Sequence, residues 1–293
     1  MIELSRQEIR QAVARALVED VGTGDATTLA TVPRDRQARA RIVAREPLTL
    51  AGLAFAIEAF RQLSRSVKAQ ALAQDGQRIA AGRAVLRLAG PAQALLTAER
   101  VALNFLQRLS GIATLTAQYA ALLASTDTRV LDTRKTTPGW RRFEKYAVAR
   151  GGGTNHRLGL HDMILVKDNH LAALRDATPN PIAAAVGRAR QHYPALKVEV
   201  EADTLAQVRQ AVDAGADFIL LDNMTPAALR RAVRLVAGRA RTEASGGITL
   251  GTLRAVAATG VDFVSVGALT HSARAVDLAL DFEENAPPRP RRS

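Results

Sequence analysis

The chain has 293 residues, of which 47% are hydrophobic and 23% are charged, with no cysteine and a formal net charge of +12. This length and composition allow a full hydrophobic core, in one large domain or in a barrel with a smaller companion, and exclude a disordered or fibrous protein. The lack of cysteine also excludes disulfide frameworks, thiolate zinc sites and cysteine nucleophiles.

The first twenty residues, MIELSRQEIRQAVARALVED, are charged throughout, unlike a signal peptide. No run reaches the roughly 18 apolar residues that a membrane-spanning helix needs. We therefore expect a soluble, cytoplasmic protein with no membrane partner. The positive charge would suit nucleic acid, but an aromatic content of 4% argues against a stacking surface for single strands. A small polyanionic substrate suits the same charge.

The first third of the chain has the pattern of a mixed α and β domain. An amphipathic helix is expected from about Ser5 to Glu19, with Ser5 and Glu8 spaced as a capping box. The alternating segments ARARIVAR and KAQALAQDG predict strands separated by turns. A long helical pattern begins near Pro91, is interrupted at Ser110-Gly111, and is expected to join two domains.

Six short β-rich runs follow, each succeeded by a helical stretch: RVLDTRK, MILVKDN, KVEVEAD, DFILLDN, TEASGG and DFVSVGA. Strands that alternate with helices predict βα units and a parallel sheet. Six such units favour a barrel-like closure over an open doubly wound sheet, which would carry GxGxxG in its first turn.

Polar residues and glycines fall at the carboxyl end of each predicted strand, where barrels place their active sites. They are Arg134, Lys135, Lys167, Asp168, Glu201, Asp222, Ser245, Gly246, Gly247 and Gly267. Six strand ends that converge in this way predict one site.

The last two strand ends resemble the phosphate cradle of barrels, in which glycine lets backbone N–H groups approach an anion. Its candidate residues are Ser245, Gly246, Gly247, Gly267 and Ala268. A Gly-Gly pair alone is usually only a turn, so this interpretation depends on its position after a strand.

Two carboxylates, Glu201 and Asp222, follow adjacent predicted strands and would face one cavity. Such a pair can hold Mg²⁺ through oxygen ligands, or grip ribose hydroxyls and stabilise a cationic sugar. The alternative is a salt bridge to a neighbouring Lys or Arg. We expect that alternative for Glu199, which is predicted to face away from Glu201.

The segment between Arg134 and Arg157 concentrates positive charge. Arg134 and Lys135 leave a strand and are expected to be held at the barrel rim, where planar donors match carboxylates and phosphates. The cations Arg141, Arg142 and Lys145 fall on a predicted helix, with a solvated face as the default interpretation.

Three histidines lie between residues 156 and 170, and their spacing is not that of a transition-metal site. His156 follows GGGTN and is interpreted as an anion-binding or hydrogen-bonding residue, whereas His161 and His170 are expected to be structural.

These segments resemble the quinolinate phosphoribosyltransferases, also called carboxylating nicotinate-nucleotide pyrophosphorylases, of NAD biosynthesis. The resemblance spans nearly the whole chain up to Asp281. It is carried by EDVGTGDATT, ERVALNFLQRLSGIAT, DTRKTTPGWR, GGGTNHRLGLHDMILVKDNH, VEVEAD, ILLDN, EASGGIT and VGALTHSARAVDLALDF.

The resemblance implies transfer of phosphoribosyl from phosphoribosyl pyrophosphate to quinolinate with Mg²⁺, releasing pyrophosphate and CO₂ and leaving nicotinate mononucleotide. It implies binding of quinolinate by Arg134, His156, Arg157 and Lys167, with Thr133 and Lys135 beside them. It assigns Lys135, Glu201 and Asp222 to catalysis, the two carboxylates also to the ribose and Mg²⁺, in part through substrate and water. It places Ser245, Gly246, Gly247, Gly267, Ala268 and His271 around the 5′-phosphate.

The family also implies a mixed α/β sandwich domain over residues 1–110 and an incomplete, six-stranded α/β barrel with parallel strands over residues 111–270. Residues 271–293 would form a C-terminal helix returning toward the first domain, followed by a basic tail. A homodimer would share its sites, with Arg100 reaching the partner's pocket, and could assemble further.

Three rival interpretations remain open. Paralogues associated with molybdenum transport resemble the same family and leave the acceptor base open. Nicotinate phosphoribosyltransferase is a second enzyme, which needs no second carboxylate pocket. A basic nucleic-acid-binding module would show affinity that falls steeply with salt, but cations and acidic residues gathered at strand ends favour the enzyme.

Overall fold

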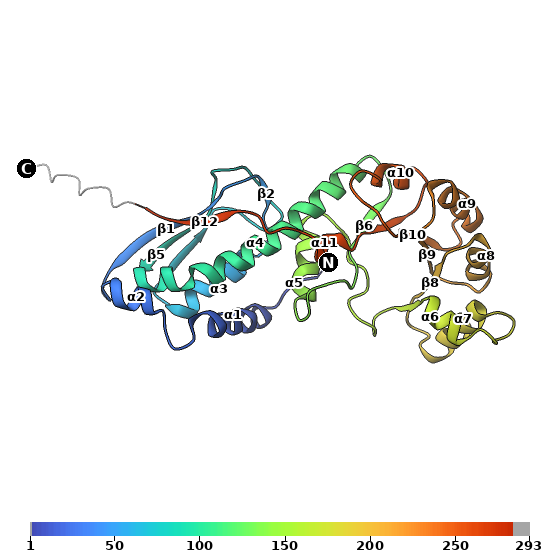
Figure 1. Cartoon of the computed structure of the whole chain (residues 1–293), viewed down its shortest axis with the longest axis horizontal. Coiled ribbons are helices and arrows are strands. Elements are labelled where there is room, and N and C mark those ends of the chain that lie inside the picture. The colour runs from blue at the N-terminus through green and yellow to red at the C-terminus, as the bar shows by residue number, and fades with distance from the viewer. Residues whose placement is uncertain (1, 284–293) are drawn as a thin grey trace, which may run out of the picture. The chain divides into compact units, whose positions relative to one another are not determined.

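The computed structural model describes residues 2–283, in which the chain forms two compact units (Figure 1). Of the described residues, the N-terminal unit comprises residues 3–114 and 273–283, and the barrel unit comprises residues 115–272 together with Ile2. The predicted basic tail lies outside the described residues. No helix within the described range has the length and apolar character required to cross a membrane.

The N-terminal unit is built on an antiparallel sheet with strand order β12-β1-β5-β3, accompanied by a two-stranded ladder of β2 and β4. Its elements are α1 (Arg6–Val21), α2 (Ala26–Thr31), β1 (Gln37–Ala44), β2 (Leu48–Thr49), α3 (Leu53–Leu63), β3 (Lys68–Ala71), β4 (Arg78–Ile79), β5 (Ala84–Pro91), the first part of α4 (Ala92–Leu123) and β12 (Leu278–Phe282). The capping box at Ser5 is confirmed, with Ser5 and Glu8 each accepting the other's backbone N–H.

The interruption predicted at Ser110-Gly111 is wrong, because α4 is continuous through both residues. The Ser110 hydroxyl accepts a hydrogen bond from Ala51 N–H at 2.9 Å. A Cβ on Gly111 would lie only 2.0 Å from the carbonyl oxygen of Arg274. The two small residues therefore allow other backbone segments to approach the helix closely, which a propensity argument reads as a break.

The predicted C-terminal helix is also absent from the described residues. Leu278–Phe282 is strand β12, which pairs antiparallel with β1 from Ala40↔Phe282 to Ala44↔Leu278. A run this short cannot sustain a helix alone, whereas the edge of β1 offers a ladder of hydrogen bonds.

The barrel unit contains six parallel strands in the order β6-β11-β10-β9-β8-β7, which confirms the predicted incomplete barrel. Its elements are β6 (Arg129–Leu131), α5 (Arg141–Arg150), β7 (Ile164–Val166), α6 (Asp168–Ala173), α7 (Pro181–His192), β8 (Val198–Ala202), α8 (Leu205–Asp213), β9 (Phe218–Asp222), α9 (Pro226–Val236), β10 (Arg241–Ser245), α10 (Leu253–Ala257), β11 (Phe263–Ser265) and α11 (Ala268–His271), besides the end of α4.

Helices α8 and α9 cover the outer side of strands β8 to β10 (Figure 1). Helix α9 begins at the N-cap Thr225 with proline in its first turn, and it buries Leu229, Ala232 and Val236. This apolar stripe at helical spacing packs against the sheet and fixes the strands whose ends carry the polar residues.

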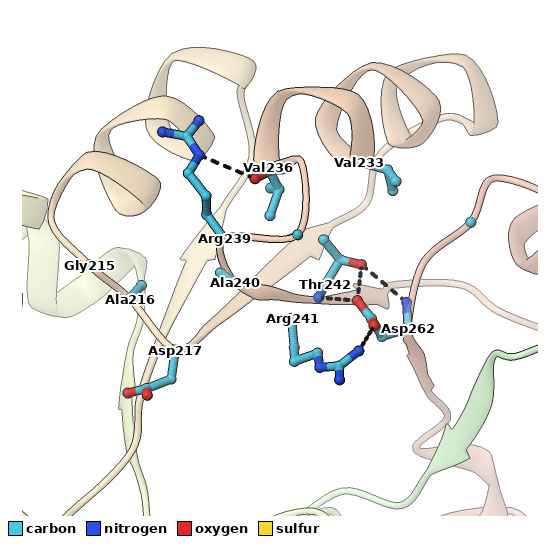
Figure 2. A pocket seen from close by; sticks show the side chains of 12 residues that line it. Gly215, Ala216, Asp217, Val233, Val236, Arg239, Ala240, Arg241, Thr242 and Asp262 are labelled. Atoms are coloured by element: carbon cyan, nitrogen blue, oxygen red, sulfur yellow. Dashed lines mark hydrogen bonds and ion pairs between the residues drawn. The ribbon is translucent and has the colours of Figure 1, made fainter.

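The amino ends of the strands carry a separate set of carboxylates (Figure 2). Asp262 accepts hydrogen bonds from Arg241 at 2.6 Å and from the backbone N–H and hydroxyl of Thr242, both at 2.8 Å. Asp217 accepts from the Val198 backbone N–H at 2.8 Å and from Lys197 and Arg190. These acids join neighbouring strands at their starts.

Candidate active site

A cavity of about 470 Å³ lies at the carboxyl ends of the barrel strands. Nine predicted residues line it: Thr133, Arg134, Lys135, His156, Arg157, Lys167, Glu201, Asp222 and Ser245. The structure adds Leu165, Leu220, Glu243 and Ser265 to the lining. Six strands thus contribute to one cavity, as the positions of the polar residues predict.

Arg134 supplies the clearest sign of what this cavity binds. It is half-buried, and its Nε is buried with no hydrogen-bond partner among residues 2–283. Burial and the nearby Arg134 lower the pKa of Arg157, against the opposing effect of Glu199. A buried guanidinium nitrogen with no partner carries a desolvation cost that an anionic ligand would offset.

The helix expected to be solvated is anchored in the core. Lys145, on α5, is fully buried and forms an ion pair with the fully buried Asp132, which directly follows β6. Burial raises the pKa of Asp132 and lowers that of Lys145, and each charge opposes the shift of the other. The solvated-face prediction is therefore wrong for Lys145.

This ion pair also holds the loop that carries two predicted ligands. Asp132 accepts from the backbone N–H of His156 at 2.8 Å and from the Asn155 amide at 2.7 Å, while Lys145 donates to the His156 carbonyl at 3.0 Å. The main chain of His156 and Arg157 is thereby fixed beside the strand that leads into Arg134.

Arg141 is also tied to the rim, which corrects its predicted solvation. Its Nε donates to the Thr136 hydroxyl at 3.0 Å, and one terminal nitrogen donates to the Leu158 carbonyl at 3.2 Å. His170 accepts from the Lys167 backbone N–H at 2.9 Å at the start of α6, a structural contact as predicted.

A second cluster gathers three acidic side chains at the ends of β8 and β9. Carboxylate oxygens of Glu201, Asp203 and Asp222 lie within 4.8 Å of one another. Burial and the neighbouring carboxylates raise the pKa of Glu201, while Lys167 opposes them. Several oxygen ligands in reach of solvent fit Mg²⁺, which retains water in its coordination shell. Sequence reasoning missed Asp203, which follows the strand and faces solvent.

Glu199 does not face away from Glu201, because residues two apart on a strand share a face. It points into the barrel, where its Oε2 lies 3.0 Å from Nε2 of His156; Glu243 Oε2 lies 3.4 Å from the same nitrogen. The expected salt bridge to Lys or Arg is therefore replaced by contact with histidine. Glu243, two residues before Ser245 on β10, could have been found by the same alternation.

These three groups titrate together. Burial disfavours a charged ring, whereas Glu199 and Glu243 favour a proton on Nε2 and raise the pKa of His156; burial beside Glu243 raises the pKa of Glu199 to about 7. Nδ1 of His156, however, accepts from the Arg157 backbone N–H at 2.7 Å, which requires a lone pair. We therefore place the shared proton on the carboxylates and interpret the ring as protonated at Nε2 only.

The glycine loops after β10 and β11 lie at the same edge of the sheet. Gly246 has φ of 96°, and a Cβ there would lie 2.1 Å from Oδ1 of Asn223. A Cβ on Gly267 would lie 3.0 Å from the Lys135 side chain and 3.1 Å from the His271 ring. Glycine is required at Gly246 for both conformation and space, whereas a side chain at Gly267 would crowd Lys135 and His271.

The remaining predicted residues fall elsewhere. Gly246, Gly247, Gly267, Ala268 and His271 follow the strand ends but do not line the cavity formed by the described residues. Arg100 is exposed on α4 in the N-terminal unit. Their ligand roles stay predictions.

The site as a whole is that of an α/β-barrel enzyme acting on small anionic molecules, with cations and carboxylates at the carboxyl ends of the strands. The comparisons with known proteins agree with this class. Residues 25–110 match the N-terminal domain, and residues 112–281 the C-terminal domain, of quinolinate phosphoribosyl transferase.

A probable carboxylating nicotinate-nucleotide pyrophosphorylase of Bacillus subtilis is 42% identical over 279 residues, covering 95% of this chain and 94% of the relative. The chloroplastic carboxylating nicotinate-nucleotide pyrophosphorylase of Arabidopsis thaliana is 39% identical, with 94% and 83% covered. The solved nicotinate-nucleotide pyrophosphorylase of Francisella tularensis superposes with a TM-score of 0.90 at 39% identity, with 96% and 98% covered. The chain belongs to the quinolinate phosphoribosyl transferase family.

Proposed function

We propose that this protein transfers the phosphoribosyl group of phosphoribosyl pyrophosphate to the ring nitrogen of quinolinate, in the biosynthesis of NAD. The products are nicotinate mononucleotide, pyrophosphate and CO₂. The observation that carries the proposal is the unpartnered, buried Nε of Arg134 in a cavity also lined by Lys135, Arg157 and Lys167. Such a cavity suits an acidic substrate, and the family to which the chain belongs supports quinolinate phosphoribosyl transfer as the reaction.

Quinolinate carries two carboxylates on neighbouring ring carbons, so its pocket needs several donors on one side. In our assignment Arg134, Arg157 and Lys167 bind these carboxylates, while Thr133 and Lys135 lie between them and the pyrophosphate. Leu165 and Leu220 add apolar surface for the pyridine ring. Guanidinium groups match carboxylates in a bidentate manner, which favours an acidic planar substrate.

The donor would occupy the acidic and glycine-rich side of the cavity. Glu201 and Asp222 are placed to hold the ribose, and with Asp203 they are placed to hold Mg²⁺. When bound, Mg²⁺ would neutralise charge on the departing pyrophosphate. The loops at Ser245–Gly247 and Gly267–His271 would present backbone N–H groups to the 5′-phosphate.

The chemistry then needs positioning and electrostatics from the chain. Pyrophosphate leaves with the electron pair of its bond to the anomeric carbon, Glu201 and Asp222 stabilise the positive charge that develops there, and the pyridine nitrogen supplies the electron pair of the new bond. The electron pair of the breaking carbon–carboxylate bond stays on C2, where the positive charge of the adjacent quaternary nitrogen stabilises it. Loss of CO₂ leaves a carbanion at C2, which takes a proton from Lys135 or from water.

The proposal includes a homodimer in the cytoplasm, in which Arg100 of one protomer completes the pocket of its partner. This part is supported by the exposed position of Arg100 on α4 and by the family resemblance. Crosslinking would test whether the protein is a dimer. Mixed dimers of an Arg100→Ala chain and an Arg134→Ala chain would test the shared site, because each mixed dimer should then contain one wild-type site and regain activity.

The test is chromatographic detection of nicotinate mononucleotide by the purified protein with Mg²⁺ and phosphoribosyl pyrophosphate, with quinolinate and nicotinate offered separately. Product from quinolinate alone, with an equal amount of CO₂, is expected. Product from nicotinate but not from quinolinate would refute the assignment of a pocket for two carboxylates. No product from either acid would refute quinolinate as the acceptor.

A further inference from the structure

The ring of His156 has both of its nitrogens engaged by the protein. Nε2 lies 3.0 Å from Glu199 and 3.4 Å from Glu243, and Nδ1 accepts the backbone N–H of Arg157 at 2.7 Å. The side chain is 9% exposed. A residue that the family resemblance marks as a ligand is thus arranged as a bridge between two buried carboxylates and the backbone of its neighbour.

The two carboxylates are placed for this contact at an evident energetic cost. Glu199 on β8 and Glu243 on β10 flank β9, have 0% and 1% exposure, and both point into the barrel. Both carboxylate oxygens of Glu199 and Oε1 of Glu243 are buried without a hydrogen-bond partner in the part of the chain that the structure describes, so Glu199 meets Nε2 of His156 at ion-pair distance. A buried carboxyl pair that lacks hydrogen-bond partners destabilises a fold even when the pair shares a proton, and apolar side chains of similar volume would destabilise it less. Their presence calls for a role at the site.

We propose that Glu199 and Glu243 are positioning residues of the acceptor pocket, holding Nε2 of His156 so that Nδ1 fixes Arg157. This inference rests on the proposed function, because it assigns Arg157 to the acceptor carboxylates. Glu199 does not line the cavity, and Glu243, which does, is assigned here to His156 and not to a substrate.

Only one of the contacts that hold Arg157 depends on the ring of His156, namely the hydrogen bond from its backbone N–H to Nδ1. Its guanidinium donates to the Met163 carbonyl at 3.1 Å, and the Asp132–Lys145 ion pair holds the main chain of the preceding residue. Rotation of the His156 ring would remove the acceptor of the Arg157 N–H and move the origin of its side chain. The guanidinium would then enter the cavity at a different angle.

Electrostatics and positioning predict effects of opposite sign, and this makes the inference testable. Because the two carboxylates share one proton, Glu199→Gln/Glu243→Gln removes one net negative charge from beside an anion-binding cavity. On charge alone, an acidic acceptor would bind more tightly. If the carboxylates position His156, neutral amides that both donate and accept no longer define the ring orientation, and the acceptor binds more weakly.

The experiment is steady-state kinetics of the double variant and of each single variant, with quinolinate and phosphoribosyl pyrophosphate varied separately. We expect KM for quinolinate to rise about tenfold in the double variant, as for a lost charge-assisted hydrogen bond, with kcat and the other KM within about twofold. Asp262→Asn is the matched control: it removes a carboxylate from the amino end of the same barrel, and it should lower the melting temperature with KM unchanged.

An unchanged or lowered KM for quinolinate in the folded double variant would overturn the inference while leaving the proposed function intact, because the wild-type protein would still form product. Nitrogen-15 spectra of His156 in the wild-type protein provide a readout that does not depend on turnover. An unprotonated Nδ1 is expected at neutral pH, and its loss in the double variant would support the bridge. A protonated Nδ1 in the wild-type protein would overturn it.

Discussion

The two ends of the barrel use acidic residues in opposite ways. At the amino end, Asp217 and Asp262 each accept a hydrogen bond from a backbone N–H and from basic side chains, and these contacts outweigh burial and lower their pKa values. Figure 2 shows the contacts of Asp262. At the carboxyl end, burial and neighbouring carboxylates raise the pKa values of Glu199 and Glu201. The carboxylates of the amino end have their hydrogen-bond partners within the protein. The carboxyl end holds polar groups, such as Nε of Arg134, that have no such partner among the described residues.

This contrast separates residues that stabilise the barrel from residues that serve the reaction. Groups with saturated contacts lower the free energy of the folded chain, and their replacement should change stability alone. Groups held without a full set of partners raise that free energy and are retained at sites of function.

The largest expected effect is on stability and comes from the buried pair that links the two roles. Lys145→Met leaves Asp132 as an uncompensated buried charge, so we expect a loss of about 3–5 kcal/mol in the free energy of unfolding. Denaturant titration measures this loss, with Lys68→Met, at an exposed lysine on β3, as the matched control. A loss no greater than that of the control would contradict the burial of the pair, and recovery in Asp132→Asn/Lys145→Met would support it.

The next largest effect is on turnover at the carboxyl end. Arg134→Ala removes the buried guanidinium assigned to quinolinate, and kcat/KM should fall about 100-fold or more, with stability unchanged or slightly higher. The control is Arg175→Ala, which removes the same charge from a side chain that is 81% exposed. Activity of Arg134→Ala equal to that of the control would remove Arg134 from the binding assignment.

A smaller effect is expected at the amino end. Asp262→Asn weakens the contacts with Arg241 and Thr242 and should lower the free energy of unfolding by about 1–3 kcal/mol, while KM stays constant. Asp213→Asn, at a carboxylate that is 65% exposed and 3.7 Å from Arg239, should change it by less than about 0.5 kcal/mol. A rise in KM for either variant would break the proposed division between the two ends.

The smallest effect is the pH dependence of stability. Because the folded-state pKa values of Asp217 and Asp262 lie below the ordinary value of 3.8, their contribution is fully present above the unfolded-state pKa and is lost as pH falls through the folded-state values. Unfolding measured between about pH 5 and pH 2 should therefore show stability decreasing with acid, less steeply in Asp262→Asn. An equally steep decrease in that variant would exclude the contribution of Asp262.

Much of the fold could be predicted because periodic patterns report directly on strands and helices. Each of the six β-rich runs became a parallel strand, and the polar residues at their ends met in one cavity. The helix break predicted at Ser110-Gly111 was wrong, because small residues that allow a neighbouring backbone to approach have the same sequence pattern as a break. LALDF became a strand because of an edge provided by β1, far away in the sequence.

Within the site, the sequence predicted the polar residues that line the cavity better than the residues that pair with other side chains. Lys145 sits among arginines that look solvated, and only the tertiary fold brings Asp132 beneath it. Glu243 was not predicted, because the Ser245–Gly247 turn that follows it is the stronger signal on this strand and indicates phosphate binding. Pairings of this kind depend on contacts across strands and loops, which one sequence does not display.

The most direct test of the contrast between the two ends is calorimetric titration of quinolinate and, separately, nicotinate into the wild-type protein and into Arg134→Ala and Asp262→Asn. Our account predicts that quinolinate binds the wild-type protein and Asp262→Asn with equal affinity, at least about tenfold more tightly than nicotinate, and that Arg134→Ala loses this preference. Equal binding of the two acids by the wild-type protein, or a preference that survives Arg134→Ala, would contradict the assignment of the carboxyl end as a dicarboxylate site.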